Sequence, residues 1–111
     1  MDTLTVCYSW PGIDIDVLRL YIEPRRDNWE AAFVNGNPEV ALLYAGEGEQ
    51  IDQLAAVEIV GFSTFAAWDD LPDLPLRWRL AGEAPMTLRQ LIRELQTRLV
   101  PHVEATARSG R

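Results

Sequence analysis

The chain has 111 residues, 48% hydrophobic and 24% charged, which predicts one soluble domain with a single core and excludes a disordered chain. With 10 Arg, no Lys and 17 acidic residues, its net charge is −7, so general binding to the phosphate backbone of nucleic acid is not expected. The charge is uneven, because residues 1–73 hold 14 acids and 3 Arg, a balance of −11, whereas residues 74–111 hold 3 Glu and 7 Arg, a balance of +4.

Cysteine and histidine are too few for several common kinds of site. Cys7 has no second cysteine for an intrachain disulfide, and His102 is the one histidine, so the usual zinc ligand sets are excluded. No basic leader followed by an apolar run begins the chain, and the longest apolar stretch, residues 54–68, is interrupted by Glu58. We therefore predict a cytoplasmic protein that makes no contact with a membrane.

The first part of the chain predicts short strands separated by turns. From Leu4 to Trp10 the side chains alternate between large apolar and small or polar, which is typical of a half-buried strand. The Asn-Gly-Asn-Pro run at 35–38 tolerates positive φ and predicts a turn, and Gly-Glu-Gly-Glu at 46–49 predicts a hairpin tip. Gly61 predicts a bulge or a close approach of two backbones. These strands cover residues 4–10, 16–23, 29–34, 40–45 and 54–62.

Residues 63–80 are less regular. The segment 63–68 fits one capped helical turn or the continuation of a strand, and six residues do not decide between the two. Residues 69–75 predict a loop, because two prolines three positions apart exclude regular pairing. A short strand over 76–80 follows, with arginines on one face and large apolar side chains on the other.

A helix is predicted after Pro85. Thr87 and Gln90 have the spacing of a capping box, and the apolar residues that follow recur at helical spacing. Pro101 predicts the end of this helix, and a frayed tail is expected over 104–111. The apolar stripe consists of Leu88, Leu91, Ile92, Leu95 and Leu99.

The order of these elements predicts an α+β fold, in which an antiparallel sheet of five to six short strands carries one C-terminal amphipathic helix on one face. A single domain is expected over residues 1–103, with the tail at 104–111. Because the edge strands of such a sheet must be covered or paired, we expect a homodimer.

Part of the strand pattern resembles a known family. The arrangement consists of Tyr8, residues 14–22 with their Asp-Val-Leu-Arg-Leu-Tyr-Ile run at 16–22, residues 40–44, and the Ala-Val-Glu-Ile-Val-Gly-Phe-Ser run at 56–63. It resembles that of short bacterial proteins catalogued as domain of unknown function 2283. The second run lacks the family's glycine, and the tyrosine of the first lies two positions further along the strand. The resemblance implies an antiparallel meander over about residues 6–63 and carries no catalytic residues.

Candidate catalytic residues do not form a recognisable set. Cys7 lies on a predicted strand and His102 just beyond the predicted helix, so an inert thiol and a surface histidine are expected. Ser9 and Ser63 lie outside any serine nucleophile motif. We therefore predict a protein that is not an enzyme, with no catalytic residues, no cofactor and no metal.

Three pairs of acidic residues could bind a cation or act as acid and base, but none has the spacing of a calcium loop and all lie where solvated carboxylates are common. Asp69 and Asp70 are the exception, because the flat side chain of Trp68 beside two acceptors could form the rim of a ligand site. The other two pairs are Asp14 with Asp16 and Glu47 with Glu49.

Four arginines form a candidate interaction surface. Arg77 and Arg79 share one face of the strand predicted at 76–80, and Arg89 and Arg93 share one side of the predicted helix. The arrangement could contact phosphate or a partner, and it also fits a solvated surface. Trp78 lies on the face opposite the strand arginines, which counts against a groove for single-stranded nucleic acid.

Three hypotheses for the function follow. The first is a non-enzymatic protein-interaction module that self-associates, with a protein partner and no nucleic acid. The second is a regulator of the antitoxin type, whose arginine-bearing helix contacts nucleic acid or whose acidic half binds a basic partner. The third is a small-ligand-binding protein or hydrolase with its site near Trp68 and Asp70.

Overall fold

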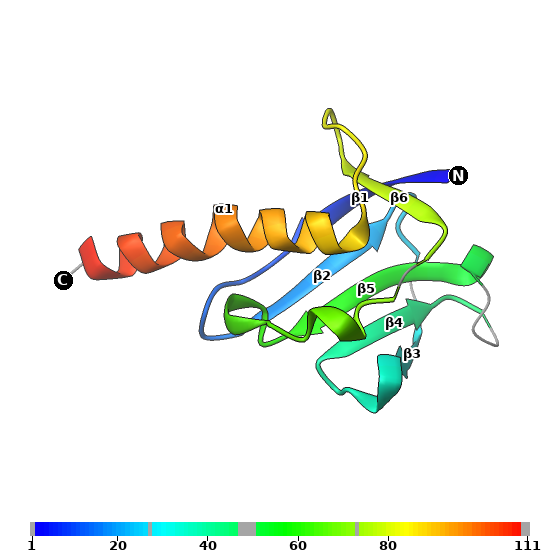
Figure 1. Cartoon of the computed structure of the whole chain (residues 1–111), viewed down its shortest axis with the longest axis horizontal. Coiled ribbons are helices and arrows are strands. Elements are labelled where there is room, and N and C mark those ends of the chain that lie inside the picture. Colours follow the sequence, from blue (N-terminus) through cyan, green and yellow to red (C-terminus); the bar gives the residue numbers. More distant parts are fainter. Residues whose placement is uncertain (1, 27, 47–50, 73, 110–111) are drawn as a thin grey trace.

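The computed structural model describes residues 2–26, 28–46, 51–72 and 74–109 of the chain (Figure 1). In these residues one six-stranded sheet carries a long α-helix across one face, and short 3-10 helices fill several connections. The main elements are β1 (Asp2–Ser9), β2 (Val17–Ile22), β3 (Glu30–Phe33), β4 (Val40–Tyr44), β5 (Leu54–Val60), β6 (Leu76–Leu80) and α1 (Leu88–Ser109).

The strand order is β3-β4-β5-β2-β1-β6, which confirms the α+β fold class and requires one correction to the predicted sheet. The first five strands pair antiparallel, whereas β6 lies parallel to β1, with Leu4 opposite Trp78. A parallel pair cannot be closed by a tight turn, so the chain must first return along the length of the sheet. Residues 61–75 make this return, which is why the loop before β6 is long.

The main core lies between the sheet and α1. Leu18, Leu20, Ile59 and Trp78 point from the sheet into this core, and each is at most 1% exposed. The predicted apolar stripe of α1 packs against them, which confirms which side of the helix is buried. In the stripe, Leu88, Leu91, Ile92 and Leu95 are buried and Leu99 is half-buried.

The start of α1 confirms the predicted capping box, and its end differs from the prediction. The amide of Gln90 donates to the Thr87 hydroxyl at 3.1 Å, and the Thr87 amide donates to Gln90 Oε1 at 2.9 Å. The prediction that Pro101 ends the helix is wrong, because α1 continues through it to Ser109. Proline costs a helix about 3 kcal/mol, but Val100 before it is buried and the residues after it favour helix. The helix therefore takes in most of the segment expected to fray, while the division into domain and tail stays a prediction.

Two uncertain segments are resolved by the structure. Residues 63–68 continue neither a strand nor an α-helix. Residues 63 and 64 complete one 3-10 helix, Phe62–Thr64, residue 68 begins another, Trp68–Asp70, and residues 65–67 join the two. Gly61 has φ of 70°, a left-handed conformation that costs glycine little, and its amide donates to the carbonyl of Asp16 at 2.8 Å. This is the close backbone approach predicted at Gly61. The predicted hairpin tip at 46–49 lies mostly outside the described residues.

No helix in the described part of the chain is long and apolar enough to cross a membrane.

Candidate functional site

Asp16 ties the loop between β1 and β2 to the end of β5. Its carboxylate accepts hydrogen bonds from the Trp10 indole at 2.9 Å, from the Ser63 amide at 2.9 and 3.1 Å, and from the Ser63 hydroxyl at 2.6 Å. The ring of Trp10 also meets Phe62 edge to face, with centroids 5.5 Å apart. Because both of its carboxylate oxygens accept hydrogen bonds from the protein, Asp16 acts as a structural anchor. Asp14, with which it was predicted to pair, is exposed in the same loop.

The anchored loop belongs to an end of the sheet with unusually apolar exposed side chains. Among the described residues, six large hydrophobic side chains are exposed, and five of them lie where β1, β3 and β5 finish or in the loop between β1 and β2. The register places them there, since Val60 pairs with Val17 at the start of β2 and Phe33 pairs with Ala41 near the start of β4. We call these five residues the apolar end: Tyr8 lies on the helix side of the sheet, Phe33 and Val60 lie on the opposite side, and Ile13 and Ile15 lie in the loop that joins β1 to β2. They are 40–63% exposed.

Sequence reasoning placed Tyr8 on a buried face, and the structure shows why it is exposed. Tyr8 does share the helix side of β1 with Val6, which is 2% exposed, but Tyr8 itself is 43% exposed. The C-terminal turns of α1 project past this end of the sheet rather than lying flat on it (Figure 1). The apolar end and the projecting helix therefore lie at the same end of the molecule.

Two of the four predicted surface arginines bind the loop before β6. Arg89 Nη2 donates to the carbonyl of Trp68 at 3.0 Å and lies 3.7 Å from Asp69 Oδ1. The guanidinium of Arg93 lies over the Trp68 ring, 4.8 Å from its centroid, and Phe65 meets that ring edge to face. Part of the basic helix is thus paired with part of the acidic half of the same chain.

The other predicted site residues have separate roles. Asp70 accepts hydrogen bonds from the side-chain amides of Asn35 at 3.2 Å and Asn37 at 2.8 Å, so it joins the β3–β4 turn to the loop. Arg79 donates from Nε to the Thr5 hydroxyl at 3.0 Å. Arg77 is exposed, and its side chain makes no hydrogen bond or ion pair with a described residue. Glu47 and Glu49 lie outside the described residues.

A cluster of ion pairs that the sequence did not predict joins α1 to the turn that precedes it. Arg98 binds Glu83 through both terminal nitrogens, at 2.6 and 3.1 Å, and binds Glu94 at 2.9 Å. Hydrogen bonding to Arg98 lowers the pKa of Glu83, and the two carboxylates raise the pKa of Arg98. The spacing of Glu94 and Arg98 on a helix could have suggested one of these pairs.

The sheet face opposite α1 has a smaller core of its own. Tyr21, Ala41, Leu43 and Ala56 are buried there beneath Trp29. Three arginines come from the same region: Arg19 pairs with Glu58 at 3.0 Å, Arg25 lies 4.1 Å from the Tyr21 ring centroid, and Arg26 donates to the carbonyl of Leu54. The middle of the sheet is therefore buried on both faces, and its cations have partners within the chain.

The candidate nucleophile Cys7 lies on this same face, whereas His102 is on α1 on the other side of the sheet. Although Cys7 is exposed, partial desolvation raises the pKa of its thiol, and the neighbouring Glu23 raises it further while Arg25 lowers it. A raised pKa keeps the thiol protonated at neutral pH, which agrees with the inert thiol expected from the sequence. No group of three His, Cys, Asp or Glu side chains in the described part of the chain could hold a metal ion.

Removing the charge of Glu23 is expected to make Cys7 more reactive. In Glu23→Gln the thiol pKa falls, so alkylation by iodoacetamide near pH 8 should accelerate about two- to fivefold, with the pH–rate profile moving to lower pH. Arg25→Gln is the matched variant of opposite sign and should slow the reaction. Equal rates in all three proteins would contradict this electrostatic environment.

The architecture defined by these observations is a mixed sheet with one helix, a structural anchor at Asp16 and an apolar end. Comparison of the chain with models of protein families, with curated proteins and with solved structures found no match. The resemblance to domain of unknown function 2283 therefore stays a prediction.

Proposed function

We propose that this protein is a non-enzymatic protein-interaction module that forms a homodimer through its apolar end. One observation carries the proposal, namely the gathering of five of the six exposed large hydrophobic side chains of the described residues at one end of the sheet. Scattered exposed hydrophobic residues are normal on a monomer, whereas a cluster of them is typical of an association surface.

The charge distribution supports a second copy as the partner. A chain of net charge −7 repels its own copies, so self-association needs a surface with few charges. From Tyr8 to Ile15 the chain carries one charged side chain, that of Asp14. A two-fold axis brings the same surface of both copies together, so the apolar side chains of the two copies can meet. The exposed carboxylates of Asp14 and Glu39 lie at this end as well, so the dimer must keep them away from their copies.

The shape of the molecule is also compatible with this dimer. At 22 residues, α1 is about 33 Å long, and its last turns pass beyond the sheet next to the apolar end (Figure 1). In a two-fold pair, the projecting helix of each copy can cover the apolar end of the other. The outer edge of β6 is paired at Trp78, which exchanges two backbone hydrogen bonds of 2.8 Å with Met86. We therefore do not assign the interface to that edge.

A charge placed in the apolar end is expected to dissociate the dimer. Ile15 is 63% exposed, so Ile15→Asp should fold normally and raise the dimer dissociation constant at least about 30-fold, measured by sedimentation velocity. Phe33→Asp should act in the same direction. The matched control is Ile51→Asp, since Ile51 is 45% exposed at the opposite end of the sheet. Equal effects of Ile15→Asp and Ile51→Asp, or no effect of Ile15→Asp and Phe33→Asp, would refute the proposed interface.

The antitoxin-type alternative is less well supported, because Arg89 and Arg93 already contact the Trp68 segment of the same chain. Its test is a gel shift at low ionic strength, in which binding must be lost in the Arg89→Ala/Arg93→Ala variant. A cytoplasmic location remains part of the proposal, and it rests on a single free cysteine in the chain.

A further inference from the structure

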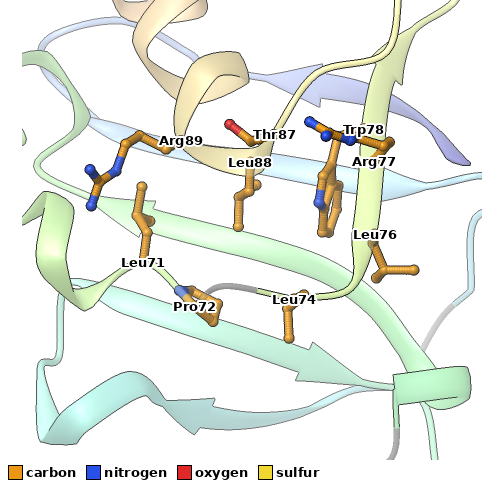
Figure 2. Close-up of a pocket in the computed structure, with 9 residues that line it drawn as sticks. All are labelled: Leu71, Pro72, Leu74, Leu76, Arg77, Trp78, Thr87, Leu88 and Arg89. Carbon is orange, nitrogen blue, oxygen red and sulfur yellow. The ribbon is translucent and has the colours of Figure 1, made fainter. Parts of the chain in front are cut away.

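A pocket of about 410 Å³ opens between the loop before β6, the strand itself and the first turn of α1 (Figure 2). Small-molecule sites in proteins occupy roughly 300–1,000 Å³, so this pocket has room for a small organic ligand. It lies at the N-terminal end of α1, whereas the apolar end lies near the projecting C-terminal turns (Figure 1). The pocket is thus separate from the proposed dimer interface.

The inner wall of the pocket is apolar and held in place by the core. Trp78, Leu88 and Leu71 line it, and they are 1%, 4% and 9% exposed, so their positions are fixed by packing on their other sides. A wall of this kind is formed before a ligand arrives and favours an apolar group over water.

Two guanidinium groups flank this apolar wall. Arg89 and Arg77 lie on opposite sides of the pocket, with Thr87 and Leu88 between them (Figure 2). The side chain of Arg77 has no hydrogen bond or ion pair with any described residue. Arg89 already has partners, because its Nη2 donates to the Trp68 carbonyl at 3.0 Å and lies 3.7 Å from Asp69 Oδ1. We therefore assign the anion to Arg77, whose guanidinium carries five N–H donors.

Charge and shape together indicate the chemistry of the ligand. A cation beside an apolar wall suits a molecule with an anionic head and an apolar body, and arginine binds carboxylates with paired hydrogen bonds. We propose that this pocket binds a small carboxylate with an apolar chain, its chain against Trp78 and Leu88 and its carboxylate at the guanidinium of Arg77.

The test is a titration of ¹⁵N-labelled protein with octanoate, kept below the concentration at which it forms micelles. Shifts are expected at the Trp78 indole N–H and at the amides of Leu88 and Arg89. Arg77→Gln should raise the dissociation constant about tenfold, because it removes a charge-assisted hydrogen bond. Arg79→Gln is the matched control, since Arg79 is on the same strand but does not line the pocket, and it should bind octanoate like the wild type.

Two further ligands separate the contributions of head and chain. Octanamide keeps the apolar chain without the charge, and inorganic phosphate supplies charge without a chain; both are expected to bind at least about tenfold more weakly than octanoate. The proposal is overturned if octanoate shifts no pocket resonance at millimolar concentration, if octanamide binds as tightly, or if Arg79→Gln weakens binding as much as Arg77→Gln. These outcomes do not depend on the oligomeric state, so they are distinguishable from failure of the proposed dimer.

Discussion

Replacing Asp16 with alanine is expected to lower the free energy of unfolding by about 3–4 kcal/mol. A hydrogen bond to a charged group contributes about 1.5–3 kcal/mol. The bonds at one carboxylate are not additive, so the total is smaller than their sum. The substitution removes the acceptor for the Trp10 indole and for the amide and hydroxyl of Ser63. It leaves these partly buried donors without a partner in the protein. Urea denaturation at neutral pH measures the loss.

Asp14→Ala is the matched control, because Asp14 is an exposed carboxylate of the same loop. Its effect on the free energy of unfolding should stay within about 0.5 kcal/mol. Asp16→Asn should lie between wild type and Asp16→Ala, since an amide oxygen can still accept some of the hydrogen bonds. If both alanine variants lose the same stability, the anchoring role of Asp16 is wrong.

Trp78→Ala is expected to have the other large effect, about 3–5 kcal/mol, because it empties the space of a large aromatic side chain that is 1% exposed. Trp78 joins the sheet core to α1, and its backbone pairs with Met86. A loss of this size is a large part of the 5–15 kcal/mol typical of a whole domain.

Trp78→Phe keeps an aromatic ring in the same place and should lose less, about 1–2 kcal/mol. It keeps the comparison informative if the alanine variant fails to fold. Denaturant unfolding followed by far-UV circular dichroism measures both variants. A change below about 1 kcal/mol in Trp78→Ala would show that this side chain is not central to the core.

Local patterns predicted most of the secondary structure. The alternation of Leu18, Leu20 and Ile22 identified β2, and the capping box at Thr87 identified the start of α1, because each signal lies within a few neighbouring residues. The parallel position of β6 was not predicted, since it depends on the path of residues 61–75 across the sheet. Alternation also could not reveal that Tyr8 is exposed, because exposure depends on where α1 leaves the sheet.

The candidate sites were harder to predict for the same reason. Asp16 and Ser63 are 47 positions apart in sequence, so neither residue's neighbours indicate that they meet. The arginines on α1 were identified as a surface, but their contacts with Trp68 depend on a loop whose conformation was left open. The apolar end takes residues from the ends of three strands and from one loop, and only the register of the sheet brings these to the same end.

The uneven charge of the chain now has a partial structural explanation. Arg89 and Arg93 from the basic segment contact the Trp68 segment of the acidic half, and Arg98 pairs with two of the three Glu residues of its own segment. Arg77 is the predicted surface arginine whose side chain makes no hydrogen bond, ion pair or ring contact with a described residue. It lies at the pocket and not at the apolar end, so charge and apolar surface belong to two different proposed sites.

The most direct test of the proposed function is the mass of the wild-type protein by size-exclusion chromatography with light scattering, at tens of micromolar and on dilution. A homodimer predicts twice the chain mass of 12.6 kDa at the higher concentrations, with the Ile15→Asp variant remaining at the chain mass. A wild-type mass of 12.6 kDa at every concentration would contradict the account.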